Sequence, residues 1–255
     1  GIITGGGTHT ISVPFLTSSS GILYDIAAGS NIIISDVTGA IDFVKAGTGT
    51  TSFLTANSYT GTTYINEGQF RGVIGSSVNA LGSGNLVFAG SGNSQATFET
   101  DNNFIRPLGT GVGEVQFIGG GGTGGGSTGF SAFGAPISIN FNNDGSTVIW
   151  GSATFNPGIF TLNGGNGTHV ATLVNSLDLG GEQRYIRLDG SGSAAERAVM
   201  GIIAGDISNG GVIKRGGGTL IFDNAKSYEA GTIVNQGALW LRGAGTAGAN
   251  VTSND

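Results

Sequence analysis

The chain has 255 residues, of which 51 are glycine, four are proline and none is cysteine, so disulfides, thiolate metal sites and cysteine nucleophiles are excluded. Its ten basic and 16 acidic side chains give a formal net charge of −6, and the basic residues form no run of the kind that nucleic-acid-binding proteins carry. No stretch approaches the roughly 20 apolar residues of a membrane helix, so we expect no nucleic-acid partner and no membrane insertion of this segment.

Short runs with apolar residues at every second position predict β-strands along the chain. The clearest runs are 114–118, 137–141, 184–189 and 219–223, each bounded by turn residues. No window of a dozen residues shows a helical stripe, and the nearest candidate, 194–203, contains Gly201. The sequence therefore predicts an all-β protein with little or no α-helix.

One internal duplication stands out. Residues 45–68 align without a gap to residues 214–237, at a constant offset of 169, and eleven of the 24 positions are identical. The identical pairs include lysine, phenylalanine, tyrosine and asparagine as well as glycine, which a chance match between glycine-rich stretches would not give. The positions that we expect to carry structure are Gly49, Phe53, Tyr59, Thr63, Asn66 and Gly68 in the first copy and Gly218, Phe222, Tyr228, Thr232, Asn235 and Gly237 in the second.

An in-register repeat favours a solenoid over a sandwich or a barrel, neither of which needs one. With coils of about 20 to 25 residues, the offset between the copies corresponds to seven or eight coils and the whole chain to roughly eleven. Glycine and asparagine suit the corners between strands, and stacked asparagine side chains can form a hydrogen-bonded ladder. We expect a parallel β-helix.

The two copies resemble the autotransporter-associated β-strand repeat. That pattern has a glycine, alternating apolar residues, an Asn-Ser/Thr-Tyr corner and a final Gly-x-Leu, which residues 49–68 and 218–239 match closely. This chain departs from the pattern at Thr62, Phe70 and Lys226. The resemblance implies a right-handed β-helix in a secreted or surface-exposed bacterial protein. We expect one domain over residues 1–255, a segment or processed unit of a longer surface protein.

Residues 182–197 hold the densest group of charges. Strand alternation would place Ile186 and Leu188 in the core and Tyr185, Arg187 and Asp189 on the outside, as an exposed aromatic ring flanked by opposite charges. Such a face could bind a glycan, although surface charges on a strand more often form weak ion pairs that keep it soluble. Trp150 and Trp240 are the other candidates for an exposed aromatic platform.

Other motifs point to structure rather than to chemistry. His9 and His169 have no neighbouring carboxylate and no serine in a nucleophile elbow, so solvated or corner histidines are favoured over a Ser-His-Asp triad, whose members meet only in space. Residues 140–145 resemble a calcium loop only in part, because Asn140 stands at its first position and Gly151 where a bidentate glutamate is needed; a turn is favoured. The glycine-rich run 119–126 lacks the residues of a phosphate loop. Asn166 and Asn250 begin glycosylation sequons.

These observations favour a non-catalytic extracellular protein without cofactor or metal. The main hypothesis is a rigid building block of a surface fibre, filament or passenger stalk that associates end to end, because neither terminus resembles the cap that a solenoid needs. The alternatives are a glycan-binding adhesin and, less favoured, a polysaccharide-cleaving β-helix enzyme with paired carboxylates on one face.

Overall fold

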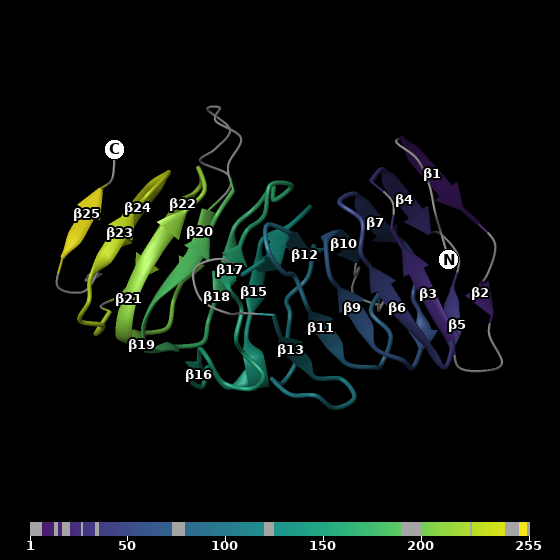
Figure 1. Cartoon of the computed structure of the whole chain (residues 1–255), viewed down its shortest axis with the longest axis horizontal. Coiled ribbons are helices and arrows are strands. Elements are labelled where there is room, and N and C mark those ends of the chain that lie inside the picture. The colour runs from purple at the N-terminus through teal and green to yellow at the C-terminus, as the bar shows by residue number, and fades with distance from the viewer. Residues whose placement is uncertain are drawn as a thin grey trace.

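The computed structural model of the chain describes residues 7–12, 15–16, 21–26, 28–33, 36–72, 80–119, 125–189, 200–224, 226–242 and 250–253. Within these ranges the chain is a parallel β-solenoid, with strands stacked along one long axis (Figure 1). The described residues contain no α-helix and one short 3₁₀ turn, Phe141–Asn143, so no helix among them could span a membrane. The prediction of an all-β solenoid is confirmed.

The longest sheet runs the whole length of the solenoid, and its neighbouring strands along this path are parallel. Their order is β1 (Thr8–Ile11), β4 (Ser30–Ile33), β7 (Thr50–Phe53), β10 (Gly68–Gly72), β12 (Gln95–Thr100), β14 (Ser127–Ala132), β17 (Ile159–Leu162), β19 (Leu177–Arg187), β21 (Ile207–Arg215), β23 (Thr232–Val234) and β25 (Val251–Ser253). We call it the long sheet.

Shorter sheets form the other sides of the coil. One contains β3 (Gly21–Asp25), β6 (Ile41–Lys45), β9 (Thr63–Ile65), β11 (Leu86–Phe88) and β13 (Val115–Phe117), and a second contains β2 (Phe15–Leu16), β5 (Val37–Gly39) and β8 (Ser58–Tyr59). Toward the C-terminus a third contains β15 (Ile137–Ile139), β18 (Ala171–Leu173), β20 (Met200–Ile203), β22 (Thr219–Asp223) and β24 (Ala238–Arg242). The short strand β16 (Val148–Ile149) pairs with the start of β19, which bends into the long sheet.

The path through the long sheet has eleven strands among the described residues, in agreement with the predicted coil number. The coils differ in length, because the step along the chain from Thr50 to its partner Gln69 is much shorter than the step from Ser127 to its partner Ile159. The central coils are long, so fewer coils fit into the 169 residues between the two repeat copies. From β7 to β21 the long sheet advances by six coils, and the step from β6 to β7 adds one side of a coil. The prediction of seven or eight coils for that offset is therefore wrong. The coils near the two ends are shorter, so the number of coils in the whole chain still agrees with the prediction.

The two copies of the repeat lie on different sides of the solenoid. In the first copy the chain turns from β6 into β7, which is in the long sheet, whereas in the second it turns out of the long sheet, from β21 into β22. The local hydrogen bonds are nevertheless the same. Asn66 N donates to Lys45 O at 2.8 Å, and Asn235 N donates to Lys214 O at 3.0 Å. The repeated unit is therefore a corner with the strands around it, and it does not depend on which sides it joins.

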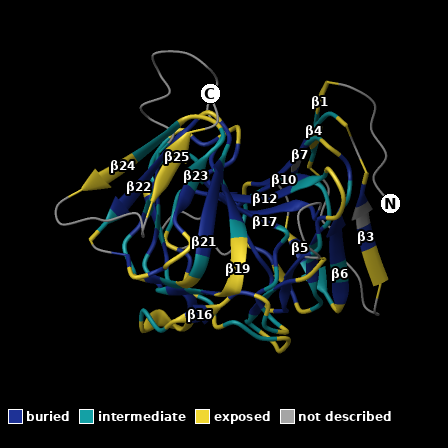
Figure 2. Cartoon of the chain, turned by 60° about the vertical axis from the view of Figure 1, so that its left-hand side comes forward, coloured by how far each residue is buried: buried dark blue, intermediate teal, exposed yellow. Residues whose placement is uncertain are grey.

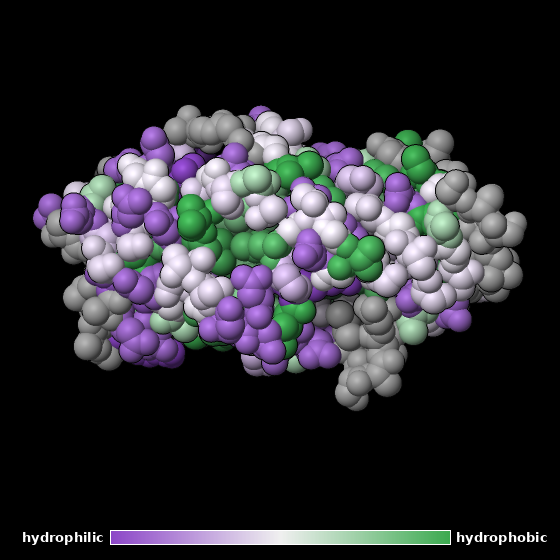
Figure 3. Space-filling model, turned by 90° about the horizontal axis from the view of Figure 1, so that it is seen from below, coloured by the Kyte–Doolittle hydropathy of each residue, from purple (hydrophilic) through white to green (hydrophobic). Residues whose placement is uncertain are grey.

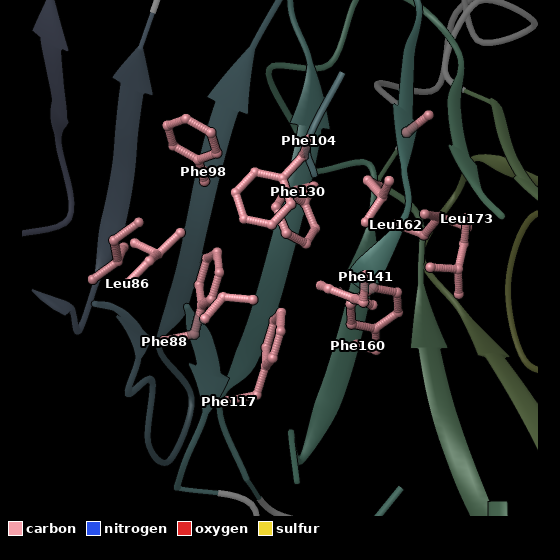
Figure 4. Packing of buried hydrophobic residues seen from close by; sticks show 14 of the residues in the cluster. Leu86, Phe88, Phe98, Phe104, Phe117, Phe130, Phe141, Phe160, Leu162 and Leu173 are labelled. Atoms are coloured by element: carbon pink, nitrogen blue, oxygen red, sulfur yellow. The ribbon is translucent and has the colours of Figure 1, made fainter. Parts of the chain in front are cut away.

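Phenylalanines fill the interior along the axis. Phe43 and Phe53 lie with ring centroids 4.9 Å apart, Phe53 and Phe70 also 4.9 Å apart, and all three are fully buried. Figure 4 shows the row continuing through the middle coils, where Phe88 stacks on Phe117 at 4.6 Å. Each buried phenylalanine contributes roughly 1.5–3 kcal/mol of transfer free energy, so this row is a large share of the driving force for coil closure.

Asparagine side chains tie one coil to the next at buried corners. Asn175 is fully buried; its Oδ1 accepts from Phe141 N at 2.7 Å, and its Nδ2 donates to Phe141 O and Ser146 O at 2.9 Å each. Asn163 makes the same kind of bridge, from Ala132 N to His169 O. At these corners asparagine bonds to the backbone of neighbouring coils, which differs from the expected ladder of asparagine side chains. The amide satisfies backbone groups that a sharp turn leaves unpaired.

Replacement of Gly68 by alanine tests the corner packing. Gly68 has φ +74°, and a Cβ there would lie 2.2 Å from Gly47 O and 2.4 Å from Gly49 O. Gly113 has the same φ with open space around its Cβ position, so it is the matched control. We expect Gly113→Ala to cost about 1–2 kcal/mol from backbone strain alone, and Gly68→Ala to cost about 1–3 kcal/mol more from the clash. Urea unfolding followed by circular dichroism measures both; equal losses would show that the corner is not tightly packed.

Candidate functional site: the outer face of the long sheet

Side chains on the outer face of the long sheet form rows along the solenoid axis, because the strands stack in register. One row contains Gln69, Thr97, Gly129, Thr161, Arg187 and Arg215. The next row contains Gln95, Ser127, Ile159, Tyr185, Ile213 and Ile233. Both rows alternate with core residues such as Phe98 and Phe130, which are fully buried. The outer face therefore combines polar, cationic and apolar groups in fixed order.

The structure brings Tyr185, Arg187 and Asp189 together on this face. Ile186 and Leu188 are fully buried, as the alternation predicts. Tyr185, however, is only 9% exposed, which corrects the expectation of an open aromatic platform. The Arg215 guanidinium lies 4.0 Å above the Tyr185 ring, and Ile159 and Ile213 pack beside it. The ring is covered because its neighbours in the row are large.

Arg187 is held by an acidic and an amide group. Its Nε donates to Asp189 Oδ1 at 2.6 Å, in a partly exposed ion pair. Gln95 reaches the same place from β12, three strands away along the long sheet, over the small residues Ser127 and Gly129. In one orientation its amide donates to Asp189 Oδ2 at 3.4 Å; in the other its oxygen accepts from Arg187 Nη1 at 3.1 Å. We favour the second orientation because it satisfies the guanidinium at the shorter distance.

Two of the pockets beside the turn at residues 91–94 lie on the same face. The first, of about 220 Å³, is lined by Gly92, Asn93, Ser94, Gly125, Ser127, Ile159, Arg187 and Arg215. The second, of about 260 Å³, is lined by Thr48, Glu67, Gly68, Gln69, Asn93, Ser94 and Gln95. Asn93 and Ser94 belong to both, so the turn separates two neighbouring hollows. We call them together the outer groove.

A second ion pair on this face is buried. Arg71 Nη2 lies 2.8 Å from Glu99 Oε2, and the Arg71 guanidinium also lies 3.6 Å from the Phe133 ring centroid. The Glu99 side chain is fully buried, and its Oε1 has no hydrogen-bond partner of good geometry. Burial raises the pKa of Glu99, while Arg71 and the nearby Asn166 amide oppose that shift. Sequence reasoning missed this pair because its members are far apart in the chain and adjacent only across one coil.

The remaining candidate residues, His9, His169, Trp150 and Trp240, belong to different coils. His169 Nδ1 contacts Thr168 Oγ1 at 2.9 Å, and His9 Nε2 is buried without a partner. Trp150 is 1% exposed and donates from Nε1 to Pro157 O, so it is a core residue and not a platform; Trp240 is 47% exposed. Within the described ranges, no group of three or more His, Asp or Glu residues is placed so that it could hold a metal ion.

The other sequence motifs have structural places or lie outside the description. Residues 140–145 form a corner around the buried Phe141, with Asn140 Oδ1 accepting from Gly145 N at 3.0 Å, so the predicted turn is confirmed. Within the glycine-rich run, residues 120–124 lie outside the described residues, as do Glu196 and Arg197 of the charged group. Asn166 and Asn250 are both exposed.

The repeat residues build two matching corners. Phe53 and Phe222 are fully buried, Tyr59 OH contacts Thr63 Oγ1 at 2.6 Å, and Tyr228 OH makes the same contact with Thr232 Oγ1. Glycine closes each corner: Gly68 and Gly237 both have φ +74°. Because Gly49 has no side chain, the preceding coil can pack against it; a Cβ there would overlap Gly29 O. These contacts give the repeated positions a structural role.

A comparison with protein families finds a match for the two segments that contain these corners. The model of the passenger-associated-transport-repeat matches residues 43–70 and 212–241. Two segments of the chain are therefore similar to this repeat. A repeat of this kind implies a secreted or surface protein, in agreement with the resemblance seen in the sequence. Comparisons with curated proteins and with solved structures find no match.

Each passenger repeat buries a lysine that the motif shares. Lys45 and Lys214 are fully buried; Lys45 Nζ donates to Gly47 O, and Lys214 Nζ donates to Gly216 O and, at 3.0 Å, to Gln236 O in the next coil. Lys226 is 4% exposed and donates to Gly205 O and Asp223 O at 2.7 Å each. These are the three lysines of the sequence. They donate hydrogen bonds to corner carbonyls, and burial lowers the pKa of each to about 8.

These buried lysines predict an unusual pH dependence of stability. Since their folded pKa lies below the unfolded value of about 10.4, the unfolded chain binds more protons between about pH 8 and 10, and stability rises with pH there. The slope is at most about 1.4 kcal/mol per pH unit for each lysine. Above about pH 10 stability falls, because burial raises the pKa of Tyr228 to about 12, whereas tyrosine in the unfolded chain ionises near 10.

Urea unfolding at intervals between pH 7.5 and about 11 measures this profile. Lys214→Met should flatten the rise, and Arg242→Gln, which changes an exposed arginine, should leave it unchanged. A stability that is flat or falls between pH 8 and 10 would contradict the assignment of buried, poorly solvated lysines.

Proposed function

We propose that this chain is a non-catalytic extracellular structural segment, a rigid building block of a passenger stalk or surface fibre that stacks end to end. The supporting observation is the long sheet, a parallel ladder that continues through every coil described. Backbone pairing along such a ladder resists bending and leaves no hinge between the coils. The passenger repeats support the extracellular part of the proposal.

The two ends of the ladder support stacking. Among the described residues, β1 pairs only with β4 and β25 only with β23, so each terminal strand has one unpaired edge. Exposed strand edges are templates for pairing with another chain. Large apolar side chains are exposed near both ends: Ile22 at 64% and Ile26 at 44%, and Trp240 at 47% and Leu241 at 48%. Figure 2 shows exposed residues along β24 and on part of β3.

Exposed apolar side chains also occur on the middle coils, among them Ile105 at 51%, Val112 at 80% and Ile149 at 55%, so the ends differ from the sides by their unpaired strand edges. In the view of Figure 3, hydrophobic residues lie in patches among hydrophilic and neutral ones. Such scattered apolar groups are normal for a soluble surface and need no partner. The proposed partner is therefore a further solenoid edge, either of a second copy or of additional repeats in the same protein.

Matched charge substitutions test the stacking. Leu241→Lys places a charge on the terminal strand β24, whereas Val112→Lys makes the same kind of change at a residue 80% exposed on a middle coil. Negative-stain imaging and light scattering over a range of concentrations should show filaments for the parent chain and for Val112→Lys, with an axial repeat of about 50 Å, or eleven layers of about 4.8 Å. Leu241→Lys should give dispersed rods. Dispersed monomers of the parent chain at high concentration would contradict the proposal.

A further inference from the structure

The outer groove contains a cation that the fold does not neutralise. Arg187 is paired with Asp189, but Arg215, its register partner in the next strand, stacks on Tyr185 and has no ion pair among the described residues. Neighbouring strands are about 4.8 Å apart, so two guanidinium groups face the same pocket from adjacent coils. Like charges at this spacing repel each other unless an anion lies between or beside them.

The walls around this cation carry hydrogen-bonding groups. The pocket of about 220 Å³ combines Arg187 and Arg215 with the amide of Asn93, while the hydroxyl groups of Ser94 and Ser127 bond to Ser91 and Thr161 within the protein. Ile159 supplies an apolar wall. The volume is below the roughly 300–1,000 Å³ of sites for drug-sized ligands, so it suits one small ring with an acidic group. A planar guanidinium binds a carboxylate through two parallel hydrogen bonds.

The second pocket extends the site along the axis. It lies on the other side of Asn93 and Ser94, and it adds the amides of Gln69 and Gln95 and the hydroxyl of Thr48. Glu67 is also there, so this hollow is less suited to a second acid and better suited to a neutral, hydroxyl-bearing unit. Two adjacent polar hollows of similar size, one cationic and one neutral to acidic, match a linear chain of sugar rings with carboxylates at intervals.

We propose that the outer groove binds a carboxylate-bearing polysaccharide, with one uronic-acid ring in the first pocket and its carboxylate on Arg215. Arg187 lies beside that carboxylate and is held in place by Asp189 and Gln95. The exposed amide of Asn93 contacts hydroxyl groups of the sugar rings from the turn between the pockets, and the hydrogen bonds between Ser94 and Ser91 hold that turn. This site is on the side of the rod, so it is independent of the stacking of the ends.

Titration calorimetry with an oligogalacturonate tests the proposal on the full chain. The expected result is saturable binding that a neutral oligosaccharide of the same length does not show. Arg215→Gln should weaken binding about tenfold or more, as loss of a charge-assisted contact requires, while Arg215→Lys should give an intermediate loss. Arg242→Gln is the control, because Arg242 is an exposed arginine paired with Asp223 outside the groove.

A further variant and a further ligand distinguish a specific uronate site from nonspecific charge attraction. Asn93→Ala changes an exposed turn residue, so it should weaken binding even if the Arg215 variants fail to fold. A sulfated dextran that binds as tightly as the uronate, with no loss in Arg215→Gln, would overturn the proposal in favour of nonspecific charge attraction. Absence of binding by the parent chain would overturn it as well, while leaving the filament experiment unaffected.

Discussion

The stacking of each coil on the previous one is the interaction on which the rest of this structure depends. Parallel backbone pairing fixes the rise between coils, so every corner must turn within the space that its neighbours leave. At Gly49 and Gly68 that space excludes even a Cβ, since it would meet backbone atoms of the preceding coil. The packing of the stack therefore requires glycine at these two corners.

Polar side chains at the corners form hydrogen bonds with backbone groups that the stacked strands leave unpaired. Sharp turns leave carbonyl and amide groups in the interior without ladder partners, and buried groups of this kind are costly. Lys214 supplies a positive charge to three carbonyls, and Asn175 supplies both a donor and an acceptor. The same lysine device appears in both passenger repeats although they lie on different sides of the solenoid, because the requirement is local to the corner.

Stacking in register also organises the outer face. A residue type placed once per coil becomes a row, and long side chains then lean over small ones, as Gln95 does over Ser127 and Gly129. Such rows need no dedicated binding loop. The solenoid therefore presents a defined chemical pattern along one side, and the proposed stalk and the proposed binding surface are compatible within one fold.

The sequence by itself determined the all-β class, the solenoid, the repeat and the alternation that buries Ile186 and Leu188 while facing Arg187 outward. These depend on neighbours a few residues apart, which a strand fixes. It did not determine that Arg215 would cover Tyr185, that Trp150 would be in the core, or that Arg71 would meet Glu99. Contacts such as these join side chains of adjacent coils, and the coils of this chain differ in length. Only the tertiary structure decides which residue lies above which, because the register is set by the closure of each whole coil.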